Sequence, residues 1–495
     1  MKTVQINTKS GPVCGSVEQG IRVFRGIPYA RPPVGPLRWC PPRDPEPWEE
    51  PLDCLTYGPN PMQPDYDPEP AYAGEFEVDR STGYSEDCLY LNVWSAEDPY
   101  RNKPVIVFLF GGGFVIGSAN TPAYEGHALA DKGAVYVSVN FRIGPFGFLV
   151  HPDLRAEQGT SGNYAILDII QALTWVHDNI AAFGGDPGNV TLMGISSGGC
   201  CAEYVALSPK ASGLVRRVAV MSYLQIHRPA PDMIGMEKRI EAEAGRTLLP
   251  DLRDLPPAQV LERFADVSEW GPCVDGSVIP FSTKQQYEYG LGNNFDLLLS
   301  CVAGDAPMAS GLGRVDMLGF AAASEDRYRI CLQRAYGSFL AEKMLEYYPG
   351  DDEQRADSIF RLKRDELMAL SFATAKWKSK HRAGNTYLCH NAYPYPGRDL
   401  GAYHGSDIPF WLGTLPSSDP EAQRLSGLLQ TYLLNFARTG DPNGPGLPEW
   451  GAYDGTLGFL DIPADLSEEI YWIGTINDYF WEHYAEDCVT SIRRS

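Results

Sequence analysis

The chain has little positive charge and no long apolar run. Its 495 residues include 41 lysines and arginines against 63 aspartates and glutamates, which gives a net charge of -22. Such a surface repels a phosphate backbone, and no cluster of lysine or arginine interrupts it, so we expect no binding of nucleic acid. The longest apolar run, residues 104–110, is too short to cross a bilayer. We therefore expect a soluble, acidic protein without a membrane anchor.

Neither the first residues nor the cysteine spacing matches a known targeting or metal-binding pattern, so we expect no secretion signal and no metal site built on paired cysteines. The first seven residues contain no apolar core of the kind that directs export, which predicts a cytoplasmic protein. The eleven cysteines are scattered, and none forms the Cys-x-x-Cys pair of a zinc site or a redox motif. We expect most of them to be free, buried thiols, and we expect neither a metal nor an organic cofactor.

Short β-branched runs alternate with longer helical stretches along the chain. This alternation is typical of an α/β protein with a mostly parallel, buried sheet and helices on both faces. No internal repeat, low-complexity tract or long linker divides the sequence, so we expect one domain over residues 1–495 with inserted loops and helices. The predicted strands are residues 105–110, 135–140, 190–193, 218–221 and 297–302, and the clearest helices are residues 164–182 and 200–207.

One serine lies between two glycines directly after a predicted strand. Residues 190–193 are followed by Gly194, Ser196 and Gly198. A chain that reverses sharply from strand to helix while exposing one hydroxyl needs small residues on either side, and this arrangement is a nucleophile elbow. Gly-x-Ser-x-Gly also fits an ordinary glycine-rich turn, so the interpretation depends on the other parts of a catalytic site.

Those parts follow from the chemistry of a serine nucleophile. Acyl transfer needs a base to accept the hydroxyl proton, an acid to orient that base, and donors for the oxyanion. Three glycines follow the strand at residues 105–110, and the amides of Gly112 and Gly113, with that of Ser197, would form the oxyanion hole. A phosphate-binding loop would need Lys-Ser/Thr or Gly-x-Gly-x-x-Gly, and neither is present here.

Eight histidines compete for the role of the base. His404 lies in a glycine-flanked loop, residues 401–410, and it follows Ser196 in the chain as the order of an α/β-hydrolase requires. His390 is the nearest alternative, but its neighbours are typical of a strand rather than a flexible loop. We therefore interpret His404 as the base.

Further segments match motifs of one family in the family's own order, from about residue 11 to residue 453. They are Phe-Arg-Gly-Ile-Pro-Tyr-Ala at residues 24–30, Pro-Pro-Val-Gly at 32–35, Glu-Asp-Cys-Leu-Tyr-Leu-Asn-Val-Trp at 86–94, Asn-Phe-Arg-Ile-Gly-Pro at 140–145 and Phe-Ala-Arg-Thr-Gly-Asp-Pro-Asn at 436–443. With the serine motif, they resemble the type-B carboxylesterase and cholinesterase family of α/β-hydrolases. The resemblance implies that family's α/β-hydrolase fold and its Ser-Glu-His triad, with Ser196 and His404 matching two members.

The acid is where the sequence departs from that family, whose pattern is a strand ending in glycine and a polar turn closing with Asp-Glu-Gly. Two registers are possible over residues 297–309. Anchoring on Gly304 puts Ala309 at the acid position and leaves the histidine without a carboxylate. Anchoring on Ser300 keeps the strand free of gaps and puts Asp305 there. We adopt the second register and predict Asp305 as the acid, since other α/β-hydrolases use aspartate.

Side chains around the serine also differ from those of the family. Phe110 stands where many carboxylesterases have histidine, and Ile195 replaces the usual glutamate beside the nucleophile. Tyr223 follows Ser222 where glycine is common. We assign Phe110, Ile195 and Tyr223 to the substrate pocket, together with Phe114 of the glycine loop. The more apolar site indicates either an uncharged, hydrophobic ester or a repurposed or engineered pocket.

The same resemblance bears on the compartment. Pro61 occupies the position of the cysteine that pairs with the counterpart of Cys88 in secreted relatives. Cys88 is then left without an evident partner, which agrees with a cytoplasmic location.

We therefore predict a serine carboxylesterase that cleaves a small ester through an acyl-enzyme on Ser196. Acyl transfer to another acceptor, or hydrolysis of an amide or carbamate, would use the same triad and stays open. The alternative from another class is a binding module that has lost catalysis, although the serine, the histidine and the glycine loop are all present here. The residues give no prediction for the physiological ester or the oligomeric state.

Overall fold

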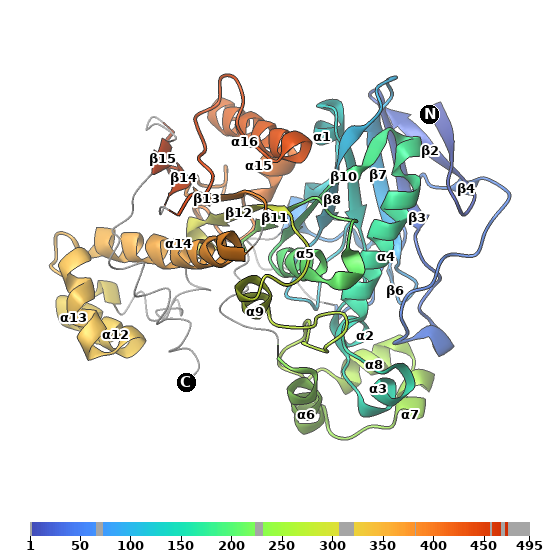
Figure 1. The fold of residues 1–495 in the computed structure, drawn as a ribbon, viewed down its shortest axis with the longest axis horizontal. Coiled ribbons are helices and arrows are strands. Elements are labelled where there is room, and N and C mark those ends of the chain that lie inside the picture. The colour runs from blue at the N-terminus through green and yellow to red at the C-terminus, as the bar shows by residue number, and fades with distance from the viewer. Residues whose placement is uncertain are drawn as a thin grey trace.

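The computed structural model describes residues 2–65, 73–222, 231–305, 321–381, 383–455, 458–466 and 471–473. One twisted sheet runs through this part of the chain, with helices on both of its faces (Figure 1). In sheet order, its strands are β1 (Lys2–Asn7), β2 (Pro12–Glu18), β3 (Ile21–Pro28), β7 (Tyr90–Ala96), β9 (Val135–Val139), β8 (Lys103–Leu109), β10 (Gly185–Ile195), β11 (Arg217–Met221), β12 (Asp296–Val302), β13 (Thr386–Asn391), β14 (Phe459–Ile462) and β15 (Tyr471–Ile473).

The centre of the sheet is parallel and its margins are antiparallel. β8 runs parallel to β9 and to β10, and the strands from β10 to β14 follow in chain order, each parallel to the next. β1, β2, β3 and β7 are joined by antiparallel pairs, and β15 closes the other margin antiparallel to β14. The five predicted strands fall within β8 to β12, which confirms the mostly parallel sheet. Three short strands lie outside this order: β4 (Leu52–Asp53), β5 (Asn60–Pro61) and β6 (Tyr84–Ser85).

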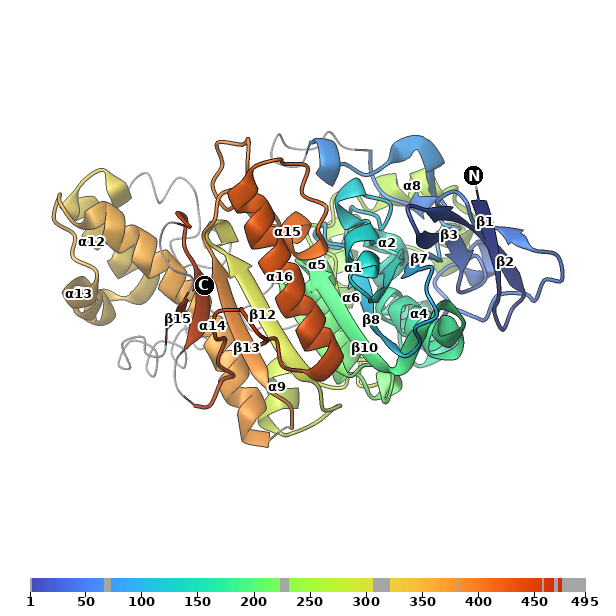
Figure 2. The same cartoon turned by 90° about the horizontal axis from the view of Figure 1, so that it is seen from above.

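Helices pack on both faces of the sheet. Figure 2 shows α16 (Pro420–Thr439) and α1 (His127–Asp131) on the face toward the viewer, where α16 contacts β8 and β10. On the other face, α4 (Tyr164–Asn179) and α5 (Ser197–Leu207) contact β10, and α14 (Arg355–His381) contacts β13. Within the described ranges, no helix is long and apolar enough to cross a membrane. The other helices are α2 (Gly144–Phe148), α3 (Pro152–Gln158), α6 (Met233–Ala244), α7 (Leu249–Asp254), α8 (Pro257–Arg263), α9 (Thr283–Glu288), α12 (Glu325–Tyr336), α13 (Ser338–Tyr347) and α15 (Ile408–Leu412).

The predicted helix over residues 164–182 shows why the pattern of apolar residues works. α4 ends at Asn179, and a 3₁₀ turn (Ile180–Phe183) carries the chain on to β10. Five of its apolar residues recur every three or four positions, and each of these five is at most 8 % exposed. The spacing of apolar residues that predicted the helix therefore also predicted which face of the helix is buried. These residues are Ile166, Ile169, Ile170, Leu173 and Val176.

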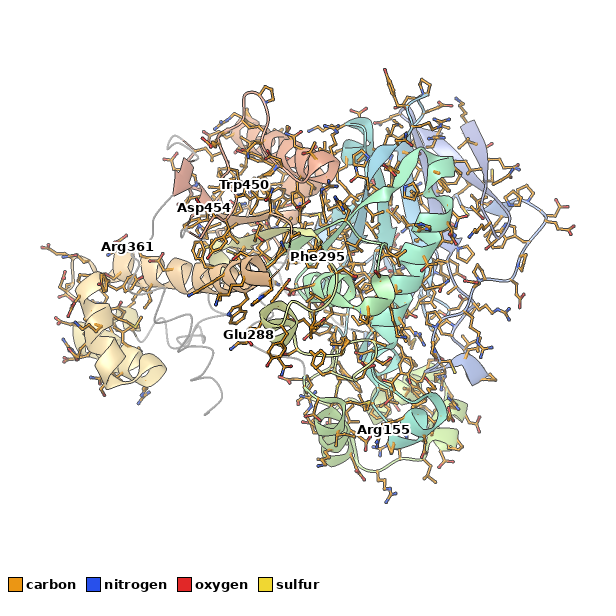
Figure 3. The ribbon with its side chains drawn as sticks, viewed as in Figure 1. Arg155, Glu288, Phe295, Arg361, Trp450 and Asp454 are labelled. Atoms are coloured by element: carbon orange, nitrogen blue, oxygen red, sulfur yellow. The ribbon has the colours of Figure 1, made fainter. Side chains whose placement is uncertain are left out.

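Trp450 packs between α16 and the sheet. Its ring centroid lies 5.2 Å from that of Tyr432 on α16 and 5.9 Å from that of Tyr387 on β13, edge to face in both contacts. Its indole nitrogen donates to the carbonyl of Leu388 at 2.9 Å. Figure 3 labels Trp450 beside these elements. Aromatic pairs of this geometry contribute about 0.5–1.5 kcal/mol each beyond their burial, so this cluster stabilises the contact between helix and sheet.

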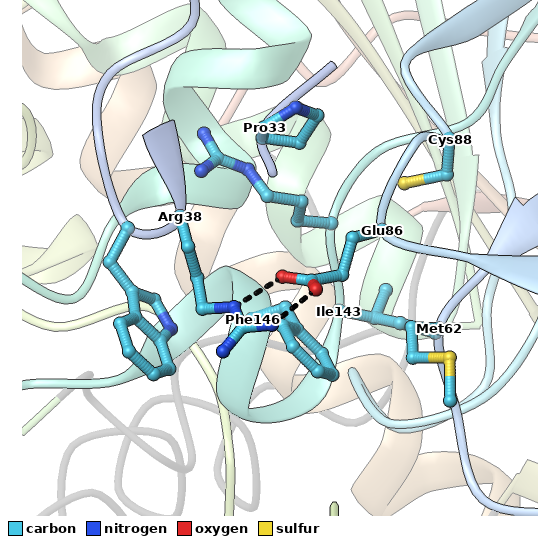
Figure 4. A pocket seen from close by; sticks show the side chains of 9 residues that line it. Pro33, Arg38, Met62, Glu86, Cys88, Ile143 and Phe146 are labelled. Atoms are coloured by element: carbon cyan, nitrogen blue, oxygen red, sulfur yellow. Dashed lines mark hydrogen bonds and ion pairs between the residues drawn. The ribbon is translucent and has the colours of Figure 1, made fainter. Parts of the chain in front are cut away.

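Two buried pairs of arginine and carboxylate connect segments that lie far apart in the sequence. Arg38 donates to both oxygens of Glu86 at 2.6 Å, and the two side chains are 5 % and 6 % exposed. Arg142 binds Asp168 in the same way, at 2.6 and 2.7 Å. The small pocket in Figure 4 is lined by Arg38, Glu86, Arg142 and the free thiol Cys88. Because its arginines are already paired with carboxylates, this pocket supports the fold, and removing one partner would leave a costly buried charge.

Glu203 is a carboxyl buried between helices. It lies on α5, is 3 % exposed, and accepts a hydrogen bond of 2.8 Å from the Tyr287 hydroxyl on α9. Burial raises the pKa of Glu203 from 4.5 to about 7, and the hydrogen bond from Tyr287 offsets only part of this effect. Between these two values, the folded protein holds a proton that the unfolded chain releases.

Stability is therefore expected to fall as the pH rises from 5 to 8. In Glu203→Gln the titrating group is absent, so the fall should be smaller by up to about 3 kcal/mol of unfolding free energy. Urea denaturation of both proteins at the two pH values measures the difference. Glu262→Gln, at an exposed position of α8, is the control and should leave the pH dependence unchanged. An equal fall in Glu203→Gln and in the parent protein would contradict the prediction.

Candidate active site

Ser196 lies at the turn between β10 and α5. Its backbone has φ 54° and ψ −125°, a strained conformation for any residue other than glycine. The turn is held on both sides, because the Ser196 amide donates to the Met221 carbonyl at 2.8 Å and its carbonyl accepts from the Cys200 amide at 3.0 Å. Among residues 191–200, only Ser196 is not fully buried. The turn thus has the backbone geometry of a nucleophile elbow.

Glycines flank this turn because nothing larger fits. A Cβ atom at Gly194 would lie 2.3 Å from the carbonyl oxygen of Gly198. A Cβ atom at Gly198 would lie 2.4 Å from the carbonyl oxygens of Leu109 and Phe110. Non-bonded atoms do not approach so closely, so a side chain at either position would push β10, α5 and the end of β8 apart. The Gly-x-Ser-x-Gly spacing is therefore a packing requirement of this fold.

The glycine loop, residues 111–117, faces the serine turn. A Cβ atom at Gly111 would lie 3.0 Å from Ser196 Cβ, so the two segments are in contact. The loop closes on itself, because the Ile116 amide donates to the Gly112 carbonyl at 3.1 Å. Gly112 has φ 124°, a value that side chains rarely allow, and this conformation keeps the turn tight.

Three main-chain amides around Ser196 have no acceptor among the described residues. They belong to Gly112, Gly113 and Ser197, and no group in the described part of the chain takes a hydrogen bond from them. Ser197 is the first residue of α5, where an amide has no partner inside the helix and the helix dipole is positive. These are the amides predicted to form the oxyanion hole.

Asp305 and His404 meet across 99 residues of sequence. β12 ends at Val302, and a 3₁₀ turn (Ala303–Asp305) follows it. Asp305 accepts from the Val302 amide through Oδ2 at 2.9 Å and contacts His404 Nδ1 through Oδ1 at 2.5 Å. Because a carboxylate only accepts, Nδ1 carries the proton and Nε2 is left as the basic nitrogen. Ala309, the acid position of the other register, lies outside the described residues.

The acid and histidine loops are joined by their main chains as well. The Gly304 amide donates to the Ala402 carbonyl at 2.7 Å. Burial opposes protonation of His404, but the Asp305 carboxylate outweighs it and raises the pKa of the imidazole above 6.5. The site therefore favours the positive imidazolium that a general base becomes when it accepts a proton.

The histidine loop also packs against the serine turn. A Cβ atom at Gly405 would lie 3.9 Å from both Cγ1 and Cδ1 of Ile195, so Gly405, which follows His404, faces the side chain that precedes Ser196. The glycine loop, the serine turn and Asp305 all follow the carboxyl ends of parallel strands, where sites of open α/β sheets form. The fold thus gathers the segments that the sequence singled out at one edge of the sheet.

His390, the alternative base, is enclosed within the sheet. It lies on β13, is 1 % exposed, and its Nδ1 contacts Asp461 Oδ1 on β14 at 2.7 Å. Its Nε2 is buried and has no hydrogen-bond partner among the described residues. A side chain held in this way cannot reach a substrate, which leaves His404 as the candidate base.

Comparisons with known proteins identify the family. A sequence model described as "Carboxylesterase family" matches residues 2–469. The chain belongs to the carboxylesterase family. Para-nitrobenzyl esterase of Bacillus subtilis (strain 168) is 30 % identical over 477 residues, which cover 90 % of this chain and 92 % of that protein. Carboxylesterase 4A of Bos taurus is 33 % identical over 502 residues, which cover 91 % and 88 %. A solved structure of PNB esterase matches with a TM-score of 0.76 and 27 % identity, over 98 % of this chain and 99 % of that one.

These matches confirm two predictions. The fold is the α/β-hydrolase fold, because the match to the solved esterase extends over nearly the whole of both chains. The chain is a serine ester hydrolase, since the matching family is the carboxylesterase family and the matched relatives are esterases.

Three of the four side chains predicted to line the substrate pocket of this carboxylesterase are described. Phe110 is 1 % exposed and stacks on Phe141, with ring centroids 4.4 Å apart. Ile195 is 4 % exposed, whereas Phe114 is half-buried. Tyr223 lies outside the described residues. Of the three side chains, Phe114 has the largest exposed fraction and is the one most accessible to a substrate. Phe110 and Ile195 are buried beneath the surface.

A second carboxyl beside the histidine was missed from the sequence. Asp407 follows His404 by three residues, is 1 % exposed, and accepts from Trp411 Nε1 at 3.0 Å. Burial raises the pKa of Asp407 to about 7, and the charge of Asp305 adds to this shift. The acidic residue in the predicted histidine loop was the available signal. Because Asp407 is mostly protonated below pH 7, Asp305 supplies the negative charge at the imidazole of this carboxylesterase.

Proposed function

We propose that this carboxylesterase hydrolyses an uncharged, hydrophobic ester through an acyl-enzyme on Ser196. The observation that carries the proposal is the 2.5 Å contact between Asp305 and His404, because it fixes the tautomer in which Nε2 is unprotonated and basic. The strained turn at Ser196 supports it, since such a conformation persists only where surrounding contacts enforce it.

Acylation begins at the serine hydroxyl. Ser196 Oγ attacks the carbonyl carbon of the ester while His404 Nε2 accepts the hydroxyl proton. Asp305 holds the ring in position and stabilises the imidazolium, in line with the raised pKa of His404. The result is a tetrahedral intermediate with a negative charge on the former carbonyl oxygen.

That oxyanion is bound by the amides of Gly112, Gly113 and Ser197. Two observations support this role of the three amides. No acceptor within the described ranges takes a hydrogen bond from them, and the Ser197 amide lies at the positive N-terminus of α5. Donors that are already oriented need no rearrangement when the charge develops, and each is worth on the order of 10² to 10³ in kcat.

The intermediate then collapses, and the alcohol leaves with the proton that His404 returns to it. In the second half of the reaction, His404 takes a proton from water, and the resulting hydroxide attacks the acyl carbon. A second tetrahedral intermediate forms at the same amides. Its collapse releases the carboxylic acid and restores the hydroxyl of Ser196.

The substrate class follows from the charge and the surroundings of the site. Ile195 and Phe110 give the serine turn apolar neighbours, and the half-buried Phe114 ring borders the glycine loop. The net charge of -22 disfavours approach of an anion. Burying a charged substrate group against such side chains is costly without a partner, so a neutral, apolar ester fits best.

We also infer a reducing, cytoplasmic compartment. Leaving Cys200 and Cys331 aside, eight cysteines in the described ranges are free thiols, and six of these are buried. Free thiols are typical of proteins kept under reducing conditions.

A matched substrate panel tests the proposal. Phenyl esters with a neutral butyryl group and with an anionic succinyl group have similar size and differ in charge. We expect kcat/KM for the neutral ester to exceed that for the anionic one by at least ~10-fold. The corresponding anilide shows whether amides are cleaved, and added alcohol shows acyl transfer. Equal or greater activity on the anionic ester would contradict the proposed substrate class.

A further inference from the structure

The side-chain amide of Gln63 pairs with the main chain of Gly117, the last residue of the glycine loop. Nε2 donates to the Gly117 carbonyl at 2.9 Å, and Oε1 accepts from the Gly117 amide at 2.9 Å. Nε2 also donates to the Pro61 carbonyl at 3.0 Å. A main-chain N–H only donates and a carbonyl only accepts, so these contacts fix the orientation of the amide. Gln63 is 2 % exposed and bonds to the loop as a neighbouring strand would.

Gly117 in turn lies against the start of the same loop. A Cβ atom at Gly117 would be 2.4 Å from the carbonyl oxygen of Gly111, and one at Gly112 would be 2.0 Å from that of Ile116. Main chains in such close contact cannot shift independently. The position of Gly117 therefore sets the position of Gly111 and Gly112, beside the serine turn.

The segment that carries Gln63 is itself anchored. β5, which ends two residues before Gln63, pairs with β6. The Asn60 side chain on β5 also accepts a hydrogen bond of 3.0 Å from Asn120, three residues beyond the glycine loop. Asn60 is fully buried. Gln63 thus connects a fixed strand to the closing residue of the loop.

We propose that Gln63 is a positioning residue, whose amide holds the glycine loop so that Gly112 and Gly113 direct their amides at the oxyanion. The inference rests on the proposed function, since it needs these amides to act as the oxyanion hole. Gln63 acts through the loop, so its removal displaces the donors without removing them. A displacement of about 1 Å at a catalytic group costs on the order of 10²-fold in rate.

Two substitutions at Gln63 test this role. Gln63→Met keeps a similar length and removes every hydrogen bond. Gln63→Glu keeps the acceptor for the Gly117 amide but turns a carboxylate toward the carbonyls of Gly117 and Pro61. On p-nitrophenyl butyrate, we expect kcat to fall by roughly 10- to 100-fold with little change in KM. Affinity for phenylboronic acid, which binds as a tetrahedral adduct, should weaken by a similar factor, with the larger loss in Gln63→Glu.

The matched control is Gln286→Met on α9. Gln286 is 1 % exposed and donates from Nε2 to the carbonyl of Phe281 at 2.9 Å, so its substitution also removes a buried amide contact. It should leave kcat and boronate affinity unchanged. Circular dichroism establishes which variants are folded. A single folded Gln63 variant is enough to test the positioning role.

Three results would overturn the inference: unchanged kcat in a folded Gln63 variant, a loss confined to KM, or an equal loss in Gln286→Met. Ser196→Ala, assayed in parallel, separates this failure from failure of the proposed function. Activity retained in Ser196→Ala contradicts the proposed function, whereas lost activity there with unchanged kcat in the Gln63 variants contradicts the positioning role alone.

Discussion

Ser196→Ala is expected to lower kcat on p-nitrophenyl butyrate by a factor on the order of 10⁴ to 10⁶, because in the proposed mechanism the hydroxyl forms the acyl-enzyme. Alanine also carries a Cβ atom, so it should adopt the turn at φ 54° at a similar cost to serine. Thermal unfolding should therefore change little. Steady-state kinetics on the purified variant measures the loss, and mass spectrometry after a fluorophosphonate probe should show the label on Ser196 in the parent protein alone.

Ser212→Ala provides the control, since it removes the same hydroxyl at an exposed position outside the site. It should keep both full activity and labelling. Retained activity in Ser196→Ala, or labelling of another serine, would contradict the proposal that Ser196 is the nucleophile.

Asp305→Asn is expected to lower kcat by a factor on the order of 10⁴, although the side chain keeps its shape. An amide can donate to Nδ1, which moves the ring proton to Nε2 and leaves the wrong tautomer for a base. The carboxylate also raises the pKa of His404, so its loss should lower that pKa. The acid limb of the residual kcat/KM profile, where the imidazole must be neutral, should therefore shift to lower pH. A pH–rate profile of parent and variant measures both effects.

Asp407→Asn is the matched control, because it replaces the other buried carboxyl near His404 with an amide. The pKa of Asp407 is raised to about 7 by burial, so the aspartate is already mostly neutral at pH 6. Its replacement should cost much less than that of Asp305 at this pH. Ala309→Glu in the Asp305→Asn background should not restore activity. Restoration there, or an indifferent Asp305→Asn, would favour the register in which Ala309 holds the acid position.

Local sequence was sufficient where the chemistry lies within a few consecutive residues. The serine turn needs glycine on both sides, because a Cβ atom at Gly194 or Gly198 would collide with main chain. Five consecutive residues are therefore enough to recognise the turn. The glycine loop and the apolar stripe of α4 were predictable for the same reason. Each depends on contacts close along the chain or on a periodic pattern that a buried face imposes.

Contacts between segments that are distant in the sequence could not be predicted from local patterns. Two registers for the acid were compatible with the sequence, and the choice rests on a hydrogen bond to His404, 99 residues away. Asp407 looked like any acidic residue of a loop, and its raised pKa arises from burial that no local pattern records. Gln63 stands in a proline-rich segment without a motif, and its contacts are with residues about fifty positions later.

The sequence by itself determined the fold, the serine turn and the candidate histidine, because strand and helix periods, glycine spacing and chain order are local or sequential properties. Only the tertiary structure shows that Asp305 contacts that histidine, that three amides near Ser196 have no acceptor among the described residues, and that the buried Gln63 side chain bonds to the glycine loop. These depend on distances between segments far apart in the chain, and such distances exist only once the sheet has brought the ends of its strands together.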